Sequence, residues 1–144
     1  MRLLLAALLV TTVWCLSAQP VQAVAAFQKV FLKHYIEDHP DEEFAKFVKT
    51  KAKCWICHQS KKRKHHNPYG EHLEELLDKK KDGKDVEKIT AALEKVGKMP
   101  SDPENKESPT YAELIAESKL PGGTLEEAKK EPEGKEESEE AAEE

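Results

Sequence analysis

The pattern of apolar and polar positions predicts a series of short amphipathic helices. Apolar residues recur three or four positions apart, a spacing that places them on one face of a helix. The pattern is found in the segments 25–35, 40–50, 71–80, 86–96 and 110–119. Asp85 and Gly97 are residue types that cap the start and the end of a helix. No alternating run rich in Val, Ile or Thr is long enough to predict a sheet, so we expect an all-α fold.

Two segments carry turn residues in place of helical spacing. The first, 59–70, is polar and basic and ends in Asn67-Pro68-Tyr69-Gly70, a combination typical of turns. The second, 99–109, contains three prolines and is expected to form a loop. Pro121-Gly122-Gly123 then predicts the end of the folded part, near Leu125.

The first 23 residues have the organisation of a secretory signal peptide. Arg2 precedes an apolar run over 3–16, and small residues lead to a cleavage site after Ala23, with Ala18 and Ala26 as alternatives. The run is too short to favour a membrane span, and Cys15 lacks the preceding small residues of a lipoprotein site. We therefore expect a periplasmic or otherwise exported protein with no stable membrane insertion after cleavage. Its parts are a signal peptide (1–23), a domain (24–125) and a tail (126–144).

Composition limits the core that this domain can build. Charged residues make up 35% of the chain and aromatic residues only 6%, so little apolar surface is available for burial. Ten Glu and three Lys give 126–144 a net charge of −7, which leaves +2 for residues 1–125 within the whole-chain charge of −5. The acidic tail has no aromatic or β-branched residue, and we expect it to be disordered.

Removal of the signal peptide leaves two cysteines, both within Cys54-Trp55-Ile56-Cys57-His58. A disulfide between residues this close in sequence would constrain little of the chain. The spacing C-x-x-C-H is that of covalent haem attachment, in which two thiols add to the two vinyl groups and the histidine binds the iron from one face. We therefore predict one covalently attached haem c on Cys54, Cys57 and His58. Such a large apolar disc would also help to fill the core.

Two other uses of the cysteines have a similar sequence pattern. A thioredoxin-like redox pair has the spacing C-x-x-C, but it belongs to a βαβ context that the helical pattern does not predict. A structural zinc site would use the two cysteines, with its tetrahedron completed from His58, His65, His66 or His72. A calcium loop over 78–89 is rejected, because Lys80 and Ile89 occupy ligand positions.

With this motif among helices, the chain resembles the small single-haem class I cytochromes c over about 44–120. The resemblance implies a few helices around one haem. It also implies that a proline carbonyl accepts a hydrogen bond from the second ring nitrogen of the haem histidine. Pro68 follows His58 at the sequence separation found in that family. The second axial ligand implied is a methionine beside a proline, which is Met99. The chain departs from the family pattern in an extra first helix and in an aromatic residue displaced to Phe47.

Histidines compete with Met99 for the sixth position of the iron, because imidazole also binds haem iron well. His65 and His66 are nearest to the motif, and a loop of seven or eight residues is long enough to pass round the edge of a haem. The other histidines are His72, His34 and His39. A lysine, a water molecule or an open site are further alternatives.

The axial ligands decide the expected function. With His58 and Met99 both bound, the iron has no free position for a substrate, which indicates electron transfer and no enzyme activity. An open sixth position would indicate a haem-based ligand sensor or a peroxidase-like protein. Residues 44–70, the basic segment, contain eight Lys or Arg and no Asp or Glu, which favours acidic redox partners. Nucleic acid is not expected as a partner of an exported chain, and the acidic tail is an alternative occupant of the basic segment.

Overall fold

The first half of the domain is helical, as the apolar pattern predicts. The computed structural model describes residues 22–132. Helix α1 (Gln22–Phe31) continues into a π-helical turn, η1 (Leu32–Ile36). Helix α2 (Glu42–Phe47) continues through a second π-helical turn, η2 (Val48–Ala52), into a 3-10 turn, η3 (Lys53–Ile56). The Asp41 carboxylate caps α2 by accepting a hydrogen bond from the backbone N–H of Phe44 at 2.9 Å.

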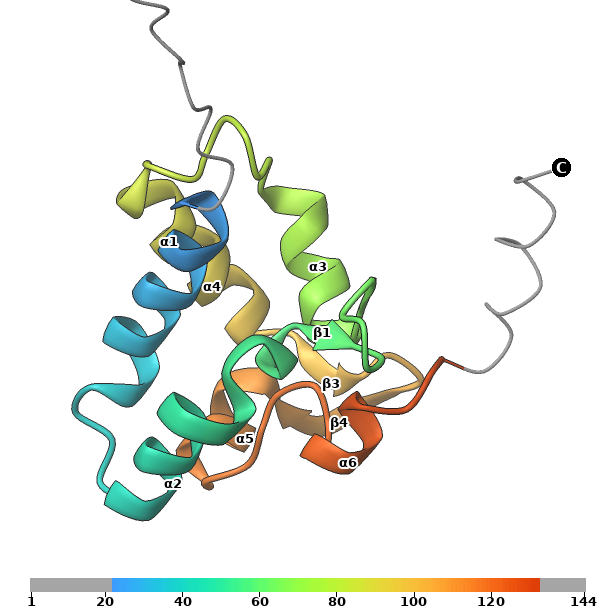
Figure 1. Cartoon of the computed structure of the whole chain (residues 1–144). Coiled ribbons are helices and arrows are strands. Elements are labelled where there is room, and N and C mark those ends of the chain that lie inside the picture. The colour runs from blue at the N-terminus through green and yellow to red at the C-terminus, as the bar shows by residue number, and fades with distance from the viewer. Residues whose placement is uncertain (1–21, 133–144) are drawn as a thin grey trace, which may run out of the picture.

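The second half is organised around α4 (Val86–Gly97), which packs against α1, α3 (Pro68–Leu76) and α5 (Tyr111–Ala116) (Figure 1). The predicted cap at Asp85 is confirmed, because its carboxylate accepts from the backbone N–H of Lys88 at 2.9 Å. A last short helix, α6 (Leu125–Ala128), follows near the motif. Capping boxes at Thr110 and Thr124 begin α5 and α6.

The prediction of an all-α fold is wrong, because the chain also forms two antiparallel strand pairs. Strand β1 (His58–Gln59) pairs with β2 (His65–His66), and β3 (Pro100–Asp102) pairs with β4 (Asn105–Thr110). The domain is a small mixed α/β structure. These strands are short and polar, so they lack the apolar alternation by which a strand is recognised in a sequence. Turn geometry and backbone pairing create them, and neither leaves a clear pattern of side chains.

One apolar cluster joins all the larger helices, and most of the residues predicted to face inward are buried in it or partly buried against it. Tyr69 and Tyr111 are fully buried at its centre, with ring centroids 5.2 Å apart in an edge-on arrangement. Val86 is an exception, since it begins α4 and is 55% exposed. The buried cluster includes Phe31, Ile36, Phe44, Val48, Ile56, Ile89, Leu93, Val96 and Ile115.

Helix α6 crosses the predicted boundary between domain and tail. It begins at Leu125, and Ala128 is only 2% exposed, so the packed structure continues beyond that boundary. Most of the predicted tail, 133–144, lies outside the described residues, as does almost all of the predicted signal peptide. Among the described helices, none is long and apolar enough to cross a membrane.

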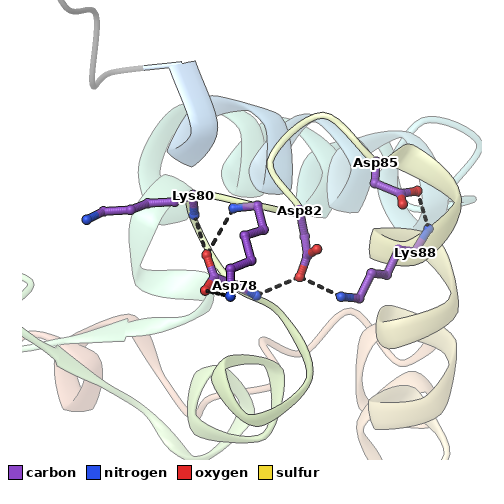
Figure 2. A network of polar contacts seen from close by, with 6 residues as sticks. Asp78, Lys80, Asp82, Asp85 and Lys88 are labelled. Atoms are coloured by element: carbon purple, nitrogen blue, oxygen red, sulfur yellow. Dashed lines mark hydrogen bonds and ion pairs between the residues drawn. The ribbon is translucent and has the colours of Figure 1, made fainter.

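A network of carboxylates and lysines closes the loop between α3 and α4 (Figure 2). One oxygen of Asp82 accepts from the backbone N–H of Asp78 and from the Lys88 ammonium, each at 2.7 Å. Asp78 in turn accepts from the backbone N–H groups of Lys80 and Lys81 at 2.8 and 2.9 Å. The hydrogen bond from Lys88 is the main cause that lowers the pKa of Asp82. The backbone hydrogen bonds from Lys81 and Lys80 lower the pKa of Asp78. The carboxylates are thus engaged by lysine and backbone donors.

We expect Asp82→Asn to destabilise the protein at neutral pH. Because the folded-state pKa of Asp82 is depressed, its carboxylate stabilises the fold above the unfolded-state pKa. That contribution is lost as the pH falls through the folded-state pKa, so the difference from the wild type should close on acidification. Urea unfolding at pH 7, 5 and 3 measures it, with Asp85→Asn as the control, since asparagine caps a helix nearly as well as aspartate. A pH-independent difference would contradict this account.

Candidate functional site

The cysteines lie where the helical path of α2 ends. The backbone of Lys53 takes a positive φ of 46°, and the 3-10 turn η3 then brings Cys54 and Cys57 to adjacent positions, with the Cys57 N–H donating to the Cys54 carbonyl at 3.3 Å. Both thiols are free and half-buried. His58 begins β1 directly after this turn. The run 54–58, the attachment run, is therefore a tight turn that presents all three predicted haem-binding residues together.

Asn67 holds the attachment run in place. Its side-chain amide donates to the carbonyls of Trp55 at 3.2 Å and Ile56 at 3.1 Å, and its backbone N–H donates to the carbonyl of Cys57 at 3.0 Å. Its side-chain oxygen accepts from the Gly70 N–H at 2.9 Å, which caps α3. Asn67 is only 1% exposed. This single residue joins the start of α3 to the turn that carries the cysteines.

The sequence interpretation of 67–70 as a turn is wrong, and it missed Asn67 as a functional residue. Helix α3 begins at Pro68, with Asn67 as its cap. Asparagine followed by proline at the first helical position is a known helix start, so the signal was present in the sequence. Gly70 lies in the first turn of α3 because the helix backbone there touches the Cys57 carbonyl, and a Cβ atom would overlap it. Glycine at 70 is thus a packing requirement.

The strand pair β1–β2 fixes the ring of His58. His66 lies directly opposite in the register, and the two rings are 4.7 Å apart between centroids and inclined by 32°. The Nδ1 atom of His58 is buried and has no hydrogen-bond partner among the described residues. Burial, with a smaller contribution from His66, lowers the pKa of His58, although the backbone of His65 opposes the shift. The ring is therefore neutral at pH 7, the state that binds a metal ion.

A cavity of about 700 Å³ opens beside the attachment run. Cys54, Cys57 and His58 all line it, and we call it the attachment cavity. Its other walls come from α1, α3 and α4, the helices seen around the upper part of Figure 1, and from the segments 63–66 and 77–80. The apolar lining consists of Phe27, Phe31, Ile56, Leu73, Leu77, Ile89 and Leu93. This volume lies within the range of about 300–1,000 Å³ typical of cofactor sites.

Charged side chains lie along the same cavity. Its lining includes the cations Lys53, Arg63, Lys64, Lys79 and Lys80, with Glu74 and Asp78. The Arg63 guanidinium donates to the Cys54 sulfur at 3.5 Å. Burial raises the pKa of the Cys57 thiol to about 12, and the adjacent Cys54 adds to the shift. Cys57 is therefore a protonated thiol at neutral pH.

A second hollow, of about 860 Å³, lies on another part of the surface between α2, α5 and α6. It is larger than the attachment cavity, but its lining contains no cysteine, histidine or methionine. The residues that carry distinctive chemistry lie at the attachment cavity, and this cavity is the better candidate for the functional site.

The attachment cavity fits a haem on two observations. The first is the set of donors, because two thiols and one neutral imidazole lie together on a largely apolar cavity of suitable volume. The second is the aromatic and aliphatic lining from α1, α3 and α4, which would contact the faces of a porphyrin. His58 would bind iron through Nε2, and Cys54 and Cys57 would hold the porphyrin edge.

The proline contact implied by the cytochrome resemblance is not present. Nδ1 of His58 has no partner, and Pro68 is instead the first residue of α3. At that position its carbonyl points along the helix axis, in the direction of the hydrogen bonds within the helix. The neighbouring Asn67 makes the connection to the attachment run in its place.

Met99 is not brought to the attachment cavity. It precedes β3, its carbonyl accepts from the Tyr111 N–H at 3.1 Å, and its side chain packs against the core without lining the cavity. Met99 as the sixth ligand therefore stays a prediction. The nitrogen donors that do line the cavity, besides His58, are His66 and several lysines.

The competing histidines occupy different places. His66 pairs with Glu74 at 2.8 Å, and its ring is too close to that of His58 to bind the same iron from the opposite face. Two imidazole nitrogens on one metal lie about 4 Å apart, and their ring centres lie further. His39 is engaged through Nε2 with the Ile115 carbonyl at 2.9 Å. His34, His65 and His72 also lie outside the cavity lining.

Comparison with known proteins identifies no relative, since no family model, no curated protein and no solved structure matches the chain. Across residues 22–132, no three His, Cys, Asp or Glu side chains are grouped so that they could hold a metal ion.

Proposed function

We propose that the protein is an exported single-haem c-type cytochrome that transfers electrons. The observation that carries this proposal is the shared location of Cys54, Cys57 and His58 on one apolar cavity. Each thiol would add its S–H across one vinyl group, which gives a thioether without an oxidant or a leaving group. His58 would supply Nε2 as an axial ligand, since its low pKa keeps the ring neutral. When bound, the haem supplies the one-electron chemistry that the side chains lack.

The surroundings of the attachment run support protein partners that carry acidic groups. The basic segment (44–70) begins on α2 and continues through the attachment run to the first turn of α3. Its lysines on η2 and in the β1–β2 loop are exposed, and no Asp or Glu lies within it. Exposed charge of one sign around a redox centre raises association rates with partners of opposite charge, and salt screens this effect.

A second candidate function is the binding of a small ligand by the iron. The observation in its favour is that Met99 does not line the attachment cavity. Without a strong sixth ligand, the same haem would have a free position for a gas or a peroxide. The two functions therefore differ in one measurable property, the occupancy of the sixth position.

For the electron-transfer proposal, we expect carbon monoxide to leave the absorption spectrum of the reduced protein nearly unchanged. A strong sixth ligand competes with the gas, whereas an open position binds it within the mixing time. Stopped-flow mixing of the dithionite-reduced protein with carbon monoxide makes the measurement. Rapid and complete binding would support the ligand-binding function instead.

Two variants then identify the ligand. If Met99→Leu reacts with carbon monoxide where the wild type does not, Met99 is the ligand, and the reduction potential should fall. If Met99→Leu behaves as the wild type, the ligand is a nitrogen from the cavity lining. Lys79→Leu is the matched variant for the lysines on that lining, since the His66 ring lies too close to that of His58 to bind the opposite face of the iron.

A further inference from the structure

The described chain ends beside the attachment run. Helix α6 is fixed by the buried Ala128 and by its capping box, and it packs against β1. The ammonium of Lys129, the residue after α6, lies 5.3 Å from the centroid of the Trp55 ring. A lysine at this distance from an aromatic face makes a cation–π contact. The path of the chain after α6 therefore starts next to the cysteines, although they are about 70 residues earlier in sequence.

The same tryptophan joins this exit to the most basic loop of the domain. The guanidinium of Arg63 lies 5.9 Å from the Trp55 ring and also reaches the sulfur of Cys54. Arg63 belongs to the run Lys61-Lys62-Arg63-Lys64, which connects β1 to β2 and is exposed at all four positions. We call this run the basic loop. Arg63 and Lys129 thus both contact one ring, which places the basic loop close to the chain exit.

The residues that follow the described part have the opposite charge. Segment 133–144 contains seven Glu and one Lys. A segment of twelve residues spans at most about 40 Å. Lys129 and Arg63 lie 5.3 and 5.9 Å from the Trp55 ring, so the basic loop is within reach of a segment that starts four residues after Lys129. Covalent connection gives it an effective concentration on the order of millimolar at that loop.

We propose that segment 133–144 binds the basic loop of its own chain and competes there with acidic redox partners. The first half of this statement rests on the charges and on the position of the exit. The second half rests on the proposed electron-transfer function. The contact is electrostatic and has no apolar groove, so it is weak, exchanges rapidly and opens as salt rises. A partner with more acidic groups than the segment displaces it.

Carbodiimide cross-linking of the mature full-length protein tests the contact without any need for haem. We expect cross-links from the glutamates of 133–144 to Lys61 and Lys62 to exceed those to Lys33 and Lys84 at least about fivefold at low salt. Lys33 and Lys84 are the controls, because both are exposed and lie on other elements of the domain. The preference should disappear in about 1 M NaCl, where the screening length is about 3 Å. Equal labelling of all four lysines, or cross-linked dimers in place of intramolecular links, would overturn the proposal.

The competition is tested with hexacyanoferrate(III), an anionic oxidant, as the probe of the basic loop. Neutralising the seven segment glutamates to glutamine should raise its rate of haem oxidation several-fold at low salt. The control neutralises the same number of exposed glutamates elsewhere, namely Glu37, Glu75, Glu87, Glu94, Glu104, Glu107 and Glu117. An equal rise in both variants would show a net-charge effect and overturn the competition. If the protein cross-links as expected but holds no haem, the contact between segment and loop stands and the electron-transfer function is refuted.

Discussion

Replacing Cys54 and Cys57 together by serine should abolish covalent haem attachment. Serine keeps the size and polarity of the side chain but has no sulfur to form a thioether. The two thiols are the free cysteines on the attachment cavity, so no other sulfur nucleophile lines it. Haem staining after denaturing electrophoresis and the mass of the intact chain measure the loss. The variant should be produced alongside the wild type in cells that export and mature c-type cytochromes.

The control for this variant is Lys61→Ser with Lys62→Ser. It introduces the same two serines into the adjacent exposed loop and leaves both thiols intact. We expect full haem attachment in this control. Haem that stays with the denatured double-cysteine variant would contradict the role assigned to the attachment run. Each single-cysteine variant should keep at most one thioether, with a haem spectrum shifted from that of the wild type.

Gly70→Ala should destabilise the protein strongly, in contrast to the usual effect of this change in a helix. Alanine is ordinarily favoured over glycine by up to about 1 kcal/mol. Here a Cβ atom would overlap the carbonyl oxygen of Cys57, and backbone atoms on both sides leave no flexible side chain to move away. We expect a loss of about 3 kcal/mol in the free energy of unfolding, measured by urea denaturation. The attachment run and α3 should separate first, since this contact joins them.

Glu75→Ala is the matched control, because Glu75 is exposed on the same helix. Its free energy of unfolding should stay within about 0.5 kcal/mol of the wild type. A Gly70→Ala protein as stable as this control would show that α3 does not touch the Cys57 carbonyl. A Gly70→Ala protein that cannot be purified supports the account provided that Glu75→Ala purifies normally.

The helices could be predicted because each buries a face at regular spacing. The apolar positions of α1, α2, α4 and α5 are the ones that pack in the core, and the cap at Asp85 was visible as a residue type. The start of α3 was missed because Asn67 and Gly70 have turn propensities. In the fold both residues contact the attachment run, and a contact between two separate segments leaves no periodic signal in the sequence.

The strand pairs could not be predicted for a different reason. The pair β1–β2 has a register set by a five-residue loop in which Ser60 and Arg63 take positive φ angles. Neither residue type favours that conformation, so local propensity pointed away from it. Such pairing depends on the backbone contacts of the whole domain. The consequence for the site is direct, because this register brings His66 against His58.

At the candidate site, the motif predicted the group of Cys54, Cys57 and His58, which the fold brings together on one cavity. Sequence spacing is sufficient to predict that these three side chains lie together, because five consecutive residues fix most of the geometry of the group. Met99 is separated from His58 by two helices and two loops, so its location depends on packing that spacing does not describe. The same is true of Lys129 and Trp55, which are 74 positions apart in the sequence (129 minus 55).

The mass of the purified mature chain under denaturing conditions tests the central claim most directly. The account predicts the mass of the polypeptide plus one haem, retained through denaturation and abolished in the double-cysteine variant. An accompanying pyridine haemochrome spectrum should show that both vinyl groups are saturated. A colourless chain at the polypeptide mass, or one that holds stoichiometric zinc before denaturation, would contradict it.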